Sequence, residues 1–263
     1  MTAVTHVVTD SATMLRRNLR HMQRYPSLTL MLVGMPIVFL LMFVYVLGGT
    51  MGAGLGGPSG GRSQYLAYVV PGILMIAIGA AAQGTAIAVA MDMTEGIIDR
   101  FRTMAISRAA VLTGHVVGAL IQTIVCIATV VVVALAIGLR PTAGPLEWSA
   151  AVGMMVLIAL ALTWLTVAMG LTAKSVETAS NTPMPLLLLP FFGSGFVPSD
   201  TMPAGLRWFA AHQPFTPMIE TVRGLLMGTR IGSSAVIAVA WCVVIGGYGY
   251  LRSRAAYDRR AVR

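Results

Sequence analysis

Long apolar runs without charge recur along the chain. The hydrocarbon core of a bilayer is about 30 Å thick, and a helix needs about 20 residues to cross it. Six runs come close to or exceed this length, at about 28–47, 65–91, 111–139, 148–171, 179–197 and 231–251. The pattern predicts an all-α integral membrane protein whose six transmembrane helices form one domain over residues 28–251.

Prolines and glycines interrupt the second and fifth runs. A freed backbone group inside a membrane is tolerated only where a neighbouring helix or a cavity satisfies it, so we expect breaks in helix regularity there. The interrupting residues are Pro71, Gly72, Gly79, Gly84, Pro183, Pro185 and Pro190.

Three amide side chains lie within or at the end of apolar runs, namely Gln83, Gln122 and Asn181. They are candidates for a polar pathway through the membrane. Hydrogen bonding between helices is the commoner role of such residues, and both roles stay open.

The stretch after the fifth run predicts two short helices. Pro203 and Pro217 each follow a threonine shortly upstream and suit the first turn of a helix. Pro214 and Gly228 suit the ends of these helices. At about ten residues, or near 15 Å, each is too short to cross the bilayer. Because each carries an apolar stripe, we expect both to be re-entrant, lying in or dipping into the outer leaflet.

Both ends of the chain are basic. Within residues 1–27, Leu15, Leu19 and Met22 share one helical face and arginines occupy another. This is typical of an amphipathic interfacial helix that contacts membrane lipids. Residues 252–263 are expected to form a basic tail.

Composition excludes a soluble globular domain. Hydrophobic residues make up 57% of the chain, charged residues 10%, and the mean hydropathy is +0.81, whereas a soluble domain carries charge on about a quarter of its residues. The net charge is +9. We expect no binding of nucleic acid, because the basic residues sit at the ends of apolar runs and form no single stripe.

The positions of the basic residues predict orientation, because Arg and Lys near helix ends are retained on the cytoplasmic side. Segments that connect consecutive spans lie alternately on the two sides of the membrane. This places five of the 18 basic residues on one side and all others on the opposite side. The five are Arg62, Arg140, Arg207, Arg223 and Arg230. Both termini are therefore expected in the cytoplasm. We expect the chain in the cell (plasma) membrane, as a multi-pass protein of a bacterium.

Motifs for catalysis are missing from the sequence. Lys174 and Ser175 end as a phosphate loop would, but Ala168 and Ala173 occupy its glycine positions. The four histidines are too scattered for a zinc motif. Ser194 lies between two glycines, yet the flanking pattern differs from a nucleophile elbow. We therefore expect no catalytic residue, no metal and no cofactor bound by this chain.

One dense charge cluster lies between two apolar runs, at Asp92–Arg108. As a helix it would place Asp92, Glu95 and Asp99 on one face and apolar side chains on another. Such a two-faced element can dock a partner or the membrane. A solvated loop is the alternative.

The spacing of this cluster resembles a known signature. Glu95-Gly96, Asp99-Arg100, Arg102-Thr103-Met104 and Ser107-Arg108, between the second and third spans, look like the coupling helix of type-2 ABC transporter permeases of the daunorubicin-type drug-resistance exporter branch. Ala105 stands where that family usually has proline. A second block, Phe196–Pro203 followed by Pro214–Pro217, resembles the outer region of the same family.

The resemblance implies a permease subunit that moves a lipophilic drug, antibiotic or lipid outward. ATP and Mg would bind to a separate ABC ATPase subunit, and a second permease subunit, identical or closely related, would complete the transporter. The residues implied at the ATPase contact are Asp92, Glu95, Gly96, Asp99, Arg100, Arg102, Ser107 and Arg108. Those implied in the outer re-entrant region are Pro198, Asp200, Pro203, Pro214, Pro217, Glu220 and Arg223.

The alternative functions are a secondary transporter and an intramembrane enzyme. A secondary transporter would normally carry an ionisable pair inside its spans, and none of the six apolar runs contains Asp, Glu, Lys or Arg. An intramembrane enzyme would need converging nucleophile, base or metal ligands, which the sequence does not show.

The predicted orientation can be tested by labelling single cysteines. A cysteine at Ser59 or Thr142 should react with a membrane-impermeant reagent in intact cells, and one at Thr103 only after permeabilisation. The reverse pattern would overturn the orientation.

Overall fold

The computed structural model describes residues 26–56, 61–94 and 108–260. Its regular elements are all helical within these ranges. They are α2 (Pro26–Met42), the π-helical η1 (Phe43–Leu47), α3 (Gly48–Gly56), α4 (Arg62–Thr94), α6 (Arg108–Ala136), α7 (Pro145–Thr172), α8 (Val176–Asn181), α9 (Met184–Leu188), the 3-10 helices η3 (Leu189–Phe192) and η4 (Ser199–Thr201), α10 (Ala204–His212), α11 (Phe215–Met227) and α12 (Ser234–Arg260).

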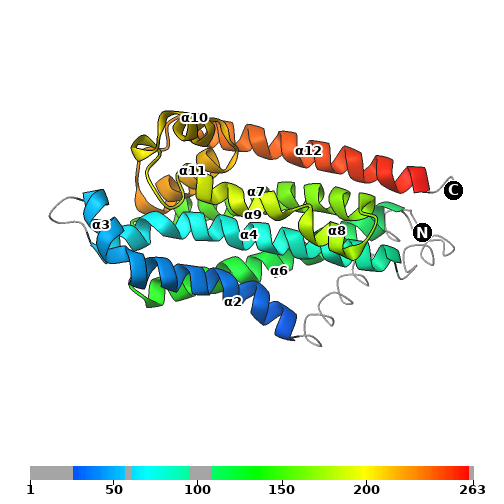
Figure 1. The fold of residues 1–263 in the computed structure, drawn as a ribbon, viewed down its shortest axis with the longest axis horizontal. Helices are drawn as coiled ribbons and strands as arrows, with labels where there is room; N and C mark the ends of the chain where they lie inside the picture. Colours follow the sequence, from blue (N-terminus) through cyan, green and yellow to red (C-terminus); the bar gives the residue numbers. More distant parts are fainter. Residues whose placement is uncertain (1–25, 57–60, 95–107, 261–263) are drawn as a thin grey trace.

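Five helices in the described ranges are long and apolar enough to cross a membrane. They are the continuous run Leu32–Gly54 through α2, η1 and α3, then α4, α6, α7 and α12. Figure 1 shows them lying lengthwise beside one another, with α3, α10 and α11 gathered at one end of the bundle and α8 at the other. The predicted all-α membrane fold is confirmed, and five of the six predicted spans appear as helices.

The fifth predicted span is not a regular helix. Over 179–197 the chain forms the end of α8, then α9 and η3, followed by turns. Pro183, Pro185 and Pro190 lie at or within these breaks, as expected of a residue that removes a helical donor and clashes with the preceding turn. The breaks expected in the fifth run are therefore present, and five of the six predicted spans are helices long enough to cross a membrane. We call residues 179–197 the interrupted segment.

The second predicted span behaves in the opposite way. α4 is continuous from Arg62 to Thr94 and contains Pro71, so the expected breaks at Pro71, Gly72, Gly79 and Gly84 are wrong for this helix.

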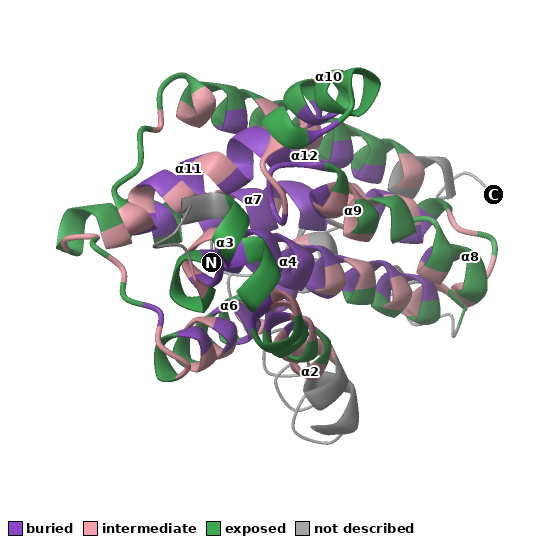
Figure 2. Cartoon of the chain, turned by 60° about the vertical axis from the view of Figure 1, so that its left-hand side comes forward, coloured by how far each residue is buried: buried purple, intermediate pink, exposed green. Residues whose placement is uncertain are grey.

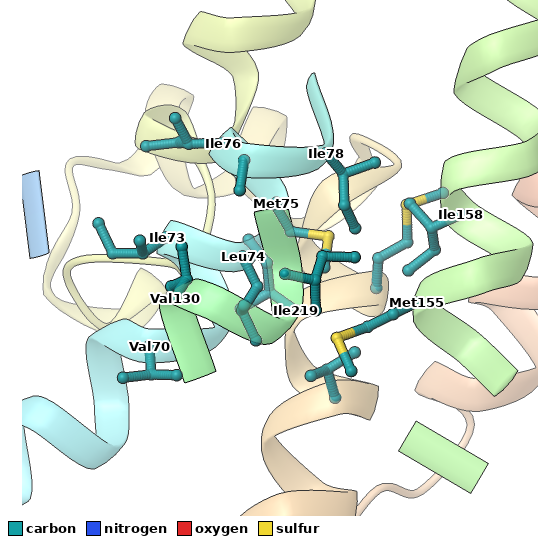
Figure 3. Close-up of a cluster of buried hydrophobic side chains, with 14 of the residues drawn as sticks. Val70, Ile73, Leu74, Met75, Ile76, Ile78, Val130, Met155, Ile158 and Ile219 are labelled. Carbon is teal, nitrogen blue, oxygen red and sulfur yellow. The ribbon is translucent and has the colours of Figure 1, made fainter. Parts of the chain in front are cut away.

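α4 forms the centre of the bundle. Buried residues make up 72% of its most apolar stretch, against 17% in α12. Figure 2 shows the buried surface concentrated on α4 and its neighbours. Figure 3 shows the core around α4, where its aliphatic side chains meet Val130 of α6, Met155 and Ile158 of α7, and Ile219 of α11.

α12 packs at the periphery through a stripe of small residues. Ala238, Cys242 and Ser253 are buried, and Gly246 and Gly249 lie between them at helical spacing on the same face, against α7. Small residues allow such close backbone approach in membranes. The other faces of α12 expose large apolar side chains, including Val236 at 73%, which suits contact with lipid.

Two predicted segments lie partly outside the described residues. The interfacial helix expected over residues 1–27 lies there except for its last two residues. α12 continues through Arg252 and Arg254 to Arg260, so the stretch expected as a basic tail is helical over most of its length.

The contact between α12 and α7 predicts the sign of a substitution. Alanine normally stabilises a helix over glycine by about 1 kcal/mol. At Gly249, however, a Cβ would lie 2.5 Å from the backbone of Trp164 and Leu165. We expect Gly249→Ala to lower stability by about 1–3 kcal/mol, measured as a lower thermal unfolding temperature in detergent.

Gly247 is the matched control, because a Cβ there meets no atom within 4 Å. Gly247→Ala should leave the unfolding temperature unchanged or raise it slightly. Equal effects of the two substitutions would contradict the close packing of α12 on α7.

Candidate functional site

The structure locates only the ends of the predicted coupling region. Asp92 lies half-buried in the last turn of α4, and Arg108 is the first residue of α6. Both helix ends lie at the end of the bundle that holds α8 and the end of α12. The other predicted coupling residues, Glu95, Gly96, Asp99, Arg100, Arg102 and Ser107, lie outside the described residues.

The three predicted pathway amides do not form one cluster. The Gln83 side-chain nitrogen donates to the Ser180 carbonyl at 2.7 Å, which ties α4 to α8. Asn181 is exposed at the end of α8, and Gln122 is half-buried on α6. Gln83 therefore has the interhelical hydrogen bond that is common for membrane amides, while a pathway role for the three residues stays a prediction.

α8 begins with a polar cap at this same end. The Ser175 hydroxyl accepts a hydrogen bond from the Thr178 amide at 3.2 Å. Hydrogen bonding with Ser175 also lowers the pKa of the exposed Glu177 carboxyl. The charged, capped turn marks where the interrupted segment starts.

The interrupted segment then follows α4 in the opposite direction. After the bond between Gln83 and Ser180, a Cβ at Gly79 would lie 3.4 Å from Leu187. Gly72 meets Gly195 further along, and the Tyr65 hydroxyl donates to the Phe196 carbonyl at 3.4 Å. The contacts thus progress along 18 residues of α4, or about 27 Å.

Glycines permit the closest part of this contact. A Cβ at Gly72 would lie 2.8 Å from the Gly195 carbonyl oxygen, and a Cβ at Gly195 would lie 2.9 Å from that of Pro190. Aromatic rings also pack in this part of the chain. The ring centroid of Phe196 lies 4.6 Å from that of Phe191 and 4.6 Å from that of Phe43 in η1. The segment is thereby held between η1 and α4.

The predicted outer prolines lie at or near the starts of short helices, including Pro214, which was expected to end the first of them. Pro198 precedes η4, Pro203 precedes α10 and Pro214 precedes α11, while Pro217 lies buried in the first turn of α11. The Asp200 carbonyl accepts a hydrogen bond from the Arg207 guanidinium at 2.6 Å, which joins η4 to α10.

The two short outer helices differ in burial. α10 exposes Leu206, Trp208 and Phe209. α11 has nine buried residues and packs against α4, α7 and α12. It ends at Gly228, whose φ of +68° is the left-handed conformation that favours glycine at a helix C-terminus. α11 is therefore part of the core, a distinction that the similar sequence patterns of the two helices did not reveal.

Arg223 of α11 joins three parts of the fold. Its guanidinium donates to the Tyr68 carbonyl at 3.3 and 3.1 Å, and to the Ser194 carbonyl at 2.6 Å. The guanidinium carbon also lies 3.8 Å from the centroid of the Tyr68 ring. We call Tyr68, Ser194 and Arg223 the Arg223 cluster; it connects α4, the interrupted segment and α11.

The Arg223 cluster lies beside Pro71 of α4. Pro71 has no N–H, so the carbonyl of Ala67, four residues earlier, loses its helical donor. Arg223 donates to the adjacent carbonyl, that of Tyr68. A guanidinium group at a sparsely hydrated site requires such partners. Glu220, one turn away on α11, accepts a hydrogen bond from Ser234 at 2.9 Å and adds a negative charge nearby.

Sequence reasoning identified Arg223 and Glu220 but missed their partners. Tyr68 lies within an apolar run, and the acceptors at Tyr68 and Ser194 are backbone carbonyls, which no side-chain pattern reveals. Gln213 and Thr216, hydrogen-bonded to each other at 3.1 Å, were missed as well. The available signal in the sequence was a single amide residue, Gln213, directly before Pro214.

Comparison with known proteins agrees with this arrangement of apolar helices and outer elements. Residues 10–227 match the ABC-2 type transporter family. The chain belongs to this family. Family members are transport components of the membrane, so the predicted type-2 ABC transporter resemblance is confirmed.

Three curated relatives of the family are similar over most of their length. The daunorubicin resistance ABC transporter permease protein DrrB1 of Streptomyces coeruleorubidus is 29% identical over 223 residues, which cover 84% of this chain and 76% of the relative. The probable doxorubicin resistance ABC transporter permease protein DrrC of Mycobacterium tuberculosis, in two strains, is 24% identical over 237 residues, covering 83% and 80%.

The Arg223 cluster predicts a large effect of removing one charge. Arg223→Met removes the guanidinium hydrogen bonds to the carbonyls of Ser194 and Tyr68. We expect the free energy of unfolding to fall by about 1–3 kcal/mol, the cost of losing hydrogen bonds from a charged donor at a buried site. Chemical or thermal unfolding of the purified protein measures it.

Arg230 provides the control, because it is an exposed arginine beyond the end of α11. Arg230→Met removes the same charge and should change stability by less than about 0.5 kcal/mol. Similar losses in the two variants would show that charge alone, and not the bonds of Arg223, is responsible.

Proposed function

We propose that the chain is the transmembrane permease subunit of an ATP-driven exporter that moves a lipophilic drug outward. The observation that carries this proposal is the family match over residues 10–227 together with relatives named as daunorubicin and doxorubicin resistance permeases. The exposed apolar faces of α12 and α2 support a subunit that works within lipid. The cargo class proposed is lipophilic drugs such as these two.

The energy source belongs to a partner in this proposal. A separate ABC ATPase subunit binds ATP and Mg, and a second permease subunit completes the pathway. The absence of a phosphate-loop sequence around Lys174 supports this division. Lipids contact the outward faces of the helices, as they do in other membrane bundles.

The interrupted segment completes the sixth crossing in this proposal. Its contacts follow α4 for about 27 Å, close to the bilayer core of about 30 Å. α4, α11 and η1 cover its irregular backbone, which is the condition for such backbone at membrane depth. Six crossings return the chain to the side on which it started.

Charge supports the proposed orientation. The end of the bundle that holds α10 carries Arg62, Arg140, Arg207 and Arg230. This is the end with fewer basic residues, which indicates the outer side. Lys174, Arg252 and Arg254 lie at the other end, with the coupling region. In this arrangement α10 lies at the outer interface, where Trp208 is 66% exposed and tryptophan is favoured.

The region 92–108 transmits force between the subunits in this proposal. It connects the inner ends of α4 and α6, and α4 is the most buried helix of the bundle. Movement of this region would therefore reach the core directly. Closely spaced acids and bases would set the register with the ATPase.

Charge reversal in the coupling region tests the proposal. Glu95→Lys combined with Asp99→Lys should reduce daunorubicin export to background and weaken co-purification with the ATPase subunit, because like charges at an interface cost several kcal/mol. Membrane insertion should persist, because the altered residues lie outside the apolar runs.

Glu177→Lys is the control, since it reverses an exposed acid at the same end of the bundle but outside the coupling region. Export by this variant should stay near the parental rate. A double variant that inserts, retains its ATPase and exports at the parental rate would defeat the coupling assignment.

A further inference from the structure

One neutral hydrogen bond holds the interrupted segment to α4 at the end near α8. The Gln83 side-chain nitrogen donates to the Ser180 carbonyl at 2.7 Å. The last four carbonyls of a helix lack an intrahelical donor, and Ser180 lies in the last turn of α8. Beyond this bond the contact is apolar, since a Cβ at Gly79 would lie 3.4 Å from the end of the Leu187 side chain.

Stronger contacts hold the end of the segment near α10. The charged group of Arg223 donates to the Ser194 carbonyl at 2.6 Å, and such bonds are about twice as strong as neutral ones. A Cβ at Gly72 would lie 2.8 Å from the Gly195 carbonyl oxygen, so backbone packs directly on backbone there. The Phe196 ring packs against two further phenylalanines. Bond strength, backbone contact and ring packing therefore all favour this end.

Burial changes in the same direction along the segment. Met184 and Leu188 are 53% and 51% exposed, whereas every residue from Gly193 to Phe196 is buried. An element with few polar bonds and exposed side chains opens locally at a lower cost than one that is bonded and buried. The end near α8 is therefore the one that separates from α4 first, while the end near α10 stays in place.

We infer that the interrupted segment is a flap, hinged at residues 193–196 and held closed at its other end by Gln83. Release of the bond between Gln83 and Ser180 lets residues 181–192 swing away from α4 and uncovers the apolar surface beneath them. By the charge count, this opening faces the inner side of the membrane. A lipophilic cargo enters there, and that step rests on the proposed export function. Gln83 is thus a positioning residue that need not touch the cargo.

Thiol protection measures the opening in the purified full-length chain in lipid nanodiscs. The native cysteines, Cys126 and Cys242, are buried and are first replaced by alanine. Leu187→Cys then reports the flap, because the Leu187 side chain lies against α4, and Ser194→Cys reports the hinge. The rate of modification by N-ethylmaleimide follows the open population when closing is fast.

Gln83→Met removes the closing bond and keeps the length of the side chain. We expect the thiol at position 187 to react about 2–10 times faster, the factor that corresponds to one neutral hydrogen bond, and the thiol at position 194 to keep its rate. Gln122→Met is the matched control, because Gln122 is a half-buried amide on α6 that makes no hydrogen bond to another described residue. It should change neither rate. An unchanged rate at position 187, or equal increases at both positions, would overturn the flap.

Addition of the ATPase subunit tests the link to transport. During ATP turnover the thiol at position 187 should react faster, while the thiol at position 194 stays protected. If Gln83→Met opens the flap in the isolated chain but ATP has no effect, the flap stands and its role in cargo entry is wrong. If the complex does not export daunorubicin at all, the proposed function fails, and the comparison of Gln83→Met with Gln122→Met still decides the flap.

Discussion

The guanidinium group of Arg223 lies where the central helix, the interrupted segment and the outer helices meet. Its donors bond the Tyr68 and Ser194 carbonyls, and its charge rests on the Tyr68 ring. Without these bonds, the carbonyls of Tyr68 and Ser194 would have fewer partners in an apolar setting, which is costly. The contact between α4, the interrupted segment and α11 therefore depends on this side chain.

Close backbone approach is the second condition for the arrangement. Gly72 and Gly195 let the interrupted segment lie directly against α4, and Gly170 does the same for α7, where a Cβ would lie 2.6 Å from the Ala86 carbonyl oxygen. A continuous, buried α4 next to a segment with few regular hydrogen bonds gives one rigid and one compliant element. We expect the compliant element to be where rearrangement costs least, since local stability follows regular bonding and burial.

Much of the fold could be predicted from the sequence because lipid imposes a simple rule. Apolar length alone located five helices, and prolines with Gly228 located α10 and α11. The rule fails where two similar patterns have different outcomes. Pro71 lies within the continuous helix α4, whereas Pro183, Pro185 and Pro190 occur too close together for α8 to continue.

The sites were less predictable for a related reason. Arg223 and Glu220 stood out as charges, but the partners of Arg223 are carbonyls that any residue could provide, and the burial of α11 relative to α10 follows from tertiary packing. The contact between the Gln213 side chain and Gly193 likewise follows from tertiary packing. The coupling residues 95–107 lie outside the described ranges, so their assignment still rests on their spacing.

We propose that this chain forms the membrane path of an ATP-driven drug exporter. Inside-out membrane vesicles that contain the chain together with its ATPase subunit measure this directly, by uptake of daunorubicin. We expect uptake that requires ATP and its hydrolysis and that is lost when either subunit is omitted. Uptake by the chain alone, driven by an ion gradient without ATP, would contradict it.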